Sequence, residues 1–184
     1  MFILPVEFFK AMLTAIKNEE IELNNLFVIN NTIYEKNHQG VCNLYETTFV
    51  YLIFKELLKR QFPYKVIWEC PYPGNKKEHC DIGLENGVTG ELEALIEFKL
   101  WIKEDDNAIK SDIRKLQEVN VSNCNRYIVV IGYGGDLKDN DQYLTDNNKA
   151  LTRINMDSLK TKYYKVKPDL IEDNDLNILM YQVK

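Results

Sequence analysis

The segment from residue 64 to residue 132 most constrains the fold, because its hydrophobic period changes from that of strands to that of a helix and back. The runs YKVIWEC (64–70), CDIGL (80–84) and ELEALIEFKLW (91–101) suit strands, and the turn signals CPYPGNKK and Asn86-Gly87 separate them. We therefore predict an antiparallel meander. Ile109, Ile113 and Leu116 recur at helical spacing, and RYIVVIG (126–132) suits a buried strand with a parallel neighbour.

The rest of the chain adds helices and one further strand. Apolar spacing predicts N-terminal helices over residues 5–18 and 20–29 and a third helix over residues 43–60, ended by Phe62-Pro63. The polar segment 136–154 suggests a loop and a helix, before a final strand over residues 176–183. A chain of 184 residues suits one domain, here with helices 1–40 packed on a core of residues 43–184.

Composition and charge limit the class of protein. No run approaches the roughly 18 apolar residues of a membrane span, and the N-terminus lacks the features of a signal peptide, so we expect a cytoplasmic protein without a membrane partner. The four cysteines are scattered and predict reduced thiols. A net charge of -5 argues against a protein that passively coats DNA, but it leaves room for a nuclease with clustered carboxylates.

Three residues in the meander indicate a catalytic centre. On strand 91–101, Glu97 and Lys99 share the face opposite the apolar side chains. Asp81 lies in the apolar run CDIGL, where an unpartnered carboxylate is costly to bury. Carboxylates on neighbouring strands suit Mg²⁺, and a lysine beside them suits activation of water and stabilisation of phosphate charge. The alternatives are a solvent-exposed Glu-Lys pair and a turn or cap role for Asp81.

A fourth acidic residue comes from the third helix, where Glu46 shares a stripe with Val50, Ile53 and Leu57. Asp81, then Glu97-Phe98-Lys99 on a hydrophobic strand, after a helix that carries Glu46, resembles the PD-(D/E)xK nuclease superfamily over residues 43–132. Cys80 stands where the short form of the motif has proline. The resemblance implies a restriction-endonuclease-like α/β core with a central mixed sheet flanked by helices. It also implies that Asp81, Glu97 and Glu46 contribute to metal binding and that Lys99 assists the water.

Further cations suggest contacts with nucleic acid. Lys115 lies on the helix after the motif, and Lys76 and Lys77 precede the Asp81 strand, so all three are candidates for phosphate binding. The alternative is that Lys115 belongs to a solvent-exposed face balanced by Asp112 and Glu118.

Taken together, these patterns predict a Mg²⁺-dependent DNA endonuclease, with Mn²⁺ as a substitute cofactor. Cutting both strands of a duplex with one centre per chain favours a homodimer, for which the N-terminal helices offer a surface. One alternative is a catalytically inactive module of the same kind that binds nucleic acid or a protein partner; another is a nuclease of the same fold that acts on RNA. A histidine-based nucleophile system has little support, since His38 and His79 are the only histidines.

Overall fold

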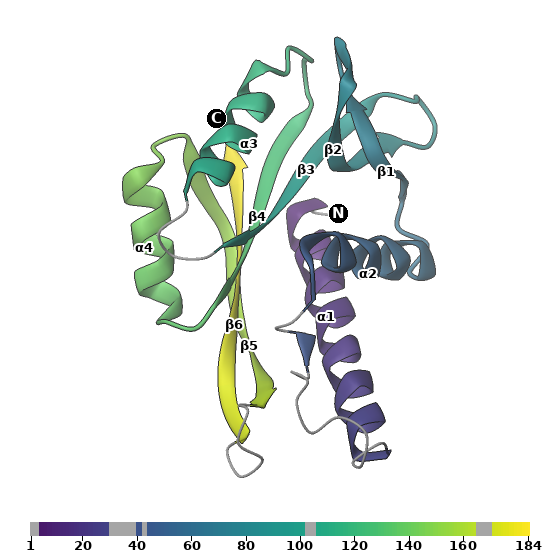
Figure 1. Cartoon of the computed structure of the whole chain (residues 1–184). Helices are drawn as coiled ribbons and strands as arrows, with labels where there is room; N and C mark the ends of the chain where they lie inside the picture. The colour runs from purple at the N-terminus through teal and green to yellow at the C-terminus, as the bar shows by residue number, and fades with distance from the viewer. Residues whose placement is uncertain (1–3, 30–39, 42–43, 102–105, 165–170) are drawn as a thin grey trace.

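The computed structural model describes residues 4–29, 40–41, 44–101, 106–164 and 171–184. These residues contain four helices and six strands (Figure 1). In chain order they are α1 (Leu4–Ile29), α2 (Glu46–Lys59), β1 (Tyr64–Tyr72), β2 (Asn75–Asn86), β3 (Leu92–Trp101), α3 (Asn107–Glu118), β4 (Asn125–Tyr133), α4 (Leu137–Asn147), β5 (Leu151–Tyr164) and β6 (Ile171–Val183).

The strands form one mixed sheet in the order β1-β2-β3-β4-β6-β5. Neighbouring strands are antiparallel except β3 and β4, which are parallel and are connected through α3. The predicted meander over β1, β2 and β3 is therefore confirmed, as are the crossover helix and the parallel partner of the RYIVVIG strand. The architecture is α/β, with a mixed sheet flanked by helices.

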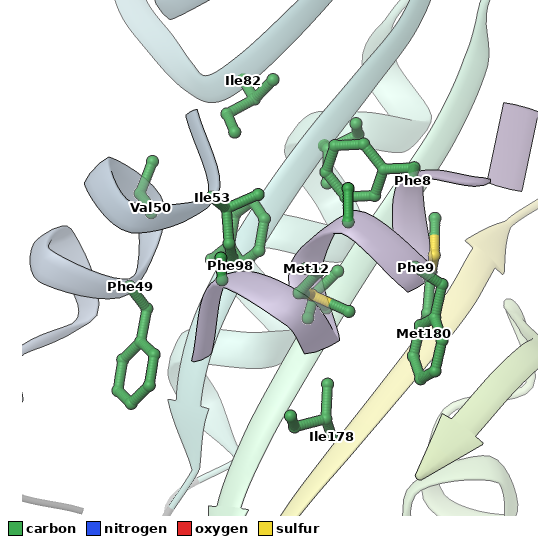
Figure 2. Packing of buried hydrophobic residues seen from close by; sticks show 14 of the residues in the cluster. Phe8, Phe9, Met12, Phe49, Val50, Ile53, Ile82, Phe98, Ile178 and Met180 are labelled. Atoms are coloured by element: carbon green, nitrogen blue, oxygen red, sulfur yellow. The ribbon is translucent and has the colours of Figure 1, made fainter. Parts of the chain in front are cut away.

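The sheet is the middle of three layers, with α1 and α2 on one face and α3 and α4 on the other (Figure 1). Each face has its own hydrophobic cluster. On the first face, Phe8 and Met12 of α1 and Ile53 of α2 pack over Phe98 of β3 and Ile178 of β6 (Figure 2). Side chains of α1 and α2 therefore cover this face of the sheet.

The N-terminal layer differs from its prediction, because α1 is one continuous helix instead of two. Neither glycine nor proline interrupts residues 6–29, so nothing in the chain forces the helix to end near Asn18. α2 begins at Glu46, three residues later than predicted, and residue 43 lies outside the described part.

The C-terminal region contains a strand that the sequence did not indicate. β5 pairs with β6 along its whole length, and the pairing slips by one residue between Arg153 and Asn155. This slip breaks the alternation of side chains that identifies a strand. β6 also begins at Ile171, before the predicted residue 176.

No helix in the described ranges is long and apolar enough to cross a membrane. Three of the four cysteines, Cys70, Cys80 and Cys124, are buried free thiols, and Cys42 lies outside the described residues.

Candidate active site

The site lies where β2 separates from β3. The two strands pair up to Ile82 and Ile96, and continuing the same register would place Asp81 opposite Glu97. Beyond this point the Phe98 amide of β3 donates to the Asp81 side chain and not to a backbone carbonyl of β2. The distance from the Phe98 amide to Asp81 Oδ2 is 2.7 Å. The Asp81 carboxylate therefore replaces a backbone hydrogen bond that β2 would otherwise make with β3.

Glu46 repeats this arrangement from the helical layer. It is the first residue of α2, and its Oε2 accepts from the Leu100 amide at 2.9 Å. Its Oε1 lies 3.1 Å from Lys99 Nζ. An acidic side chain in the first turn also interacts favourably with the helix dipole. Two alternate amides of β3, at residues 98 and 100, are therefore satisfied by carboxylates from β2 and α2.

Glu97 is the most buried of these acids, with 4% of its surface exposed. The Tyr72 hydroxyl donates a hydrogen bond to Glu97 Oε1, and Glu97 also shares a hydrogen bond with Asp81. Burial raises the pKa of Glu97 to about 8, and the nearby negative charges of Asp81 and Asp112 add to this effect. Burial also raises the pKa of Asp81. With its pKa raised to about 8, the Glu97 carboxyl keeps its proton at neutral pH and can donate it to Asp81.

Tyr72 reaches Glu97 because β1 changes face at Glu69. Before this residue, Val66 and Trp68 pack on the side of α1 and α2; after it, Cys70 and Tyr72 belong to the opposite cluster. Glu69 adopts a left-handed backbone with φ of 47°, which a residue with a side chain rarely does. The sequence singled out no tyrosine for the site, since regular alternation would have placed Tyr72 with Trp68.

Lys99 lies between two carboxylates. Its Nζ is 3.1 Å from Glu46 Oε1 and 3.0 Å from Oδ2 of Asp112, a residue of α3. Burial alone would lower the pKa of Lys99, but Asp112 and Glu46 outweigh it and raise the pKa to about 12. The ammonium group is therefore protonated and held at two sides.

Lys115 also contacts Asp112, with its Nζ 2.8 Å from Oδ1. The hydrogen bond to Asp112 is the main reason that the pKa of Lys115 is raised. One of the two interpretations of the sequence placed Asp112 on a solvent-exposed face of this helix, and for Asp112 it was wrong, because this residue is only 5% exposed. Its spacing of three residues from Ile109 and four from Leu116, both in the buried stripe of α3, was the available signal.

Lys76 and Lys77 are placed differently from Lys115. Both are exposed at the start of β2. Within the described part of the chain, no hydrogen bond or ion pair links their side chains to the four carboxylates. The structure thus brings together Glu46, Asp81, Glu97, Lys99 and Lys115, adds Tyr72 and Asp112, and leaves Lys76 and Lys77 apart.

Asp81 and Glu97 are the carboxylates of this site that could hold a divalent cation. Among the side chains that the structure describes, no three His, Cys, Asp or Glu residues stand in a metal-binding arrangement. Mg²⁺ requires fewer, because it keeps several waters and is usually held by one or two carboxylates together with substrate phosphate. Asp81 and Glu97 supply two such carboxylates, and a cation would relieve the cost of holding them together without water. The donor set fits.

Comparisons with protein families, curated proteins and solved structures found no match to this chain.

Proposed function

We propose that this protein is a Mg²⁺-dependent endonuclease of the PD-(D/E)xK type with a restriction-endonuclease-like core. The main support for this proposal is that Asp81 and Glu97 lie side by side where β2 separates from β3. Lys99 lies on the same face of β3 as Glu97. The order α2, β1, β2, β3, α3, β4, with a parallel β3-β4 pair, supports the core assignment.

The residues divide the proposed chemistry among them. Asp81 and Glu97 would hold Mg²⁺ or Mn²⁺, and Glu46 would orient Lys99 and contribute to the outer ligand shell. The bound ion would supply Lewis-acid polarisation of the phosphate and a more acidic water. Lys99, kept protonated by its two carboxylates, would orient the attacking water and stabilise negative charge on the phosphate oxygens.

DNA is the proposed substrate, and a homodimer is the proposed assembly for cleavage of both strands. Lys115 is the proposed phosphate contact nearest to the centre, since it shares Asp112 with Lys99. Lys76 and Lys77 are proposed as outer contacts on the exposed end of the β1-β2 hairpin. Their electrostatic contribution would appear as a salt dependence of binding.

The test is cleavage of supercoiled plasmid with Mg²⁺, with Mn²⁺ and with EDTA. Glu97→Ala and Lys99→Ala should each lower the rate by about 100-fold or more, because each removes a group that acts on the reacting phosphate. Glu91→Ala and Lys138→Ala, which alter exposed residues away from the centre, serve as matched controls and should cleave normally. Absence of cleavage by the folded native protein would refute the proposal and favour a binding module or an RNA substrate, which binding and cleavage assays with RNA would separate.

A further inference from the structure

We propose that Asp112 is a positioning residue of this centre, holding Lys99 in its reactive place and Lys115 toward the substrate. The inference rests on the proposed nuclease function and deepens it, since the sequence motif contains no residue of α3. It identifies one buried carboxylate that organises both cations.

The geometry shows one carboxylate shared by two ammonium groups. Oδ2 of Asp112 lies 3.0 Å from Lys99 Nζ, and Oδ1 lies 2.8 Å from Lys115 Nζ. The Asp112 side chain is 7% exposed, whereas those of Lys99 and Lys115 are 20% and 34% exposed. The anion is therefore the fixed, buried member of the cluster, and the cations extend from it toward solvent.

Lys99 is held from both helical layers of the molecule. Glu46 belongs to α2 and Asp112 to α3, and these helices lie on opposite faces of the sheet (Figure 1). Glu46 can reach Lys99 because β2 has left the edge of β3 at this point. A long lysine side chain has many rotamers, and two carboxylates on opposite sides select one position for its ammonium group.

The burial of Asp112 indicates that its charge has a use. It lies among the buried apolar residues of α3, where Ile109, Ile113 and Leu116 pack against the sheet. A buried carboxylate costs free energy unless it is paired, and an apolar residue at such a position is often at least as stable. The stability of the fold therefore does not explain why this position holds an aspartate. Binding Lys99 and Lys115 does explain it.

The two lysines are placed for different tasks. Lys99 lies two residues from Glu97 on β3, next to the proposed reaction centre. Lys115 lines a hollow of about 250 Å³ between the β1-β2 turn and the end of α3, together with Tyr72, Asn75 and Glu78. We therefore assign Lys99 to the chemical step and Lys115 to binding of the nucleic-acid backbone beside it.

The kinetic test uses the full-length protein, with Asp112→Asn, Asp112→Glu and Lys115→Ala. Asp112→Asn preserves the shape of the side chain but removes the charge, and kcat should fall about 10- to 100-fold, as for other residues that orient a catalytic group. Lys115→Ala should raise KM severalfold and leave kcat within twofold. Asp112→Glu should restore part of the lost kcat. Asp146→Asn, which removes an exposed carboxylate from α4, should match the native enzyme.

A second measurement is independent of activity. The rates at which acetic anhydride acylates Lys99 and Lys115, followed by mass spectrometry, should rise severalfold in Asp112→Asn, because the amines lose their partner. Native kcat and KM in Asp112→Asn, or unchanged acylation of Lys99, would overturn the positioning role. If the native protein cleaves nothing, the proposed function fails, and the acylation rates still decide whether Asp112 holds the lysines.

Discussion

Replacing Glu97 by glutamine should stabilise the metal-free protein at alkaline pH. The pKa of Glu97 is raised from 4.5 to about 8 in the folded protein, chiefly by burial. Between these two values the folded state binds a proton that the unfolded state has lost, so the stability of the native protein falls as pH rises through this window. Glutamine has nearly the same shape and carries no charge, so it removes this loss.

The size of the effect follows from the shift. One pKa unit corresponds to about 1.4 kcal/mol, so a rise from 4.5 to about 8 corresponds to a loss on the order of 5 kcal/mol above pH 8. For a domain of this size, 1 kcal/mol changes the melting temperature by about 2–4 °C. A gain of roughly 10 °C or more for Glu97→Gln at pH 9 is therefore expected, with a much smaller difference at pH 4.

The assay is urea denaturation and thermal melting in EDTA at pH 4, 7 and 9, with Glu91→Gln as the control for removing an exposed charge. Adding Mg²⁺ at pH 9 should stabilise the native protein and leave Glu97→Gln unchanged, because ligand binding to the folded state adds stability. If the native protein and Glu97→Gln show the same dependence on pH, Glu97 does not titrate as a buried acid and the electrostatic account of the site is wrong.

Substitutions at three further positions test the local structure of the site by urea denaturation at neutral pH. Glu69→Gly should leave stability unchanged or raise it by about 1 kcal/mol, because glycine accepts the left-handed backbone. Glu69→Val should lower stability by at least as much, because a β-branched residue does not accept that backbone. Equal effects of the two substitutions would show that the backbone at residue 69 is not strained. Gly83→Ala should lower the free energy of unfolding by about 1–3 kcal/mol, since a Cβ there would lie 2.4 Å from Cys70 Sγ. If the variant is as stable as the native protein, β1 and β2 can move apart without cost. Asp81→Asn retains an oxygen that can accept from the Phe98 amide, so this variant should be more stable than Asp81→Ala while losing metal binding. Equal losses of stability in the two variants would show that the hydrogen bond from the Phe98 amide does not stabilise the fold.

The sequence was most informative where the backbone is regular. Period-two alternation placed Glu97 and Lys99 together on β3, and the turn at Asn86-Gly87 led to the β2-β3 pairing that brings Asp81 to them. Glu46 was identified because a charged residue interrupted the apolar stripe of α2. Each of these residues lies on an element whose period alone determines the direction of the side chain.

The residues that the sequence missed depend on tertiary structure. Tyr72 enters the site only because β1 reverses its faces at Glu69, and a left-handed glutamate has no reliable sequence signal. Asp112 looked like part of an exposed face because its charged neighbours hid its burial; the packing of α3 across β3 and β4 determines that it is covered. β5 was missed because its many polar side chains and its slipped pairing obscure the alternation of a strand.

The carboxylates of this centre serve the fold and the proposed chemistry together. Where β2 leaves β3, two backbone amides lose their strand partner, and Asp81 and Glu46 replace it. This brings Asp81 beside Glu97 in a buried place, where burial raises the pKa of Glu97 to about 8 and also raises the pKa of Asp81. Binding of a divalent cation would release the Glu97 proton, and the affinity for the cation should therefore increase as pH rises toward 8. The break in the sheet creates both the ligands and the unfavourable charge that a cation would neutralise.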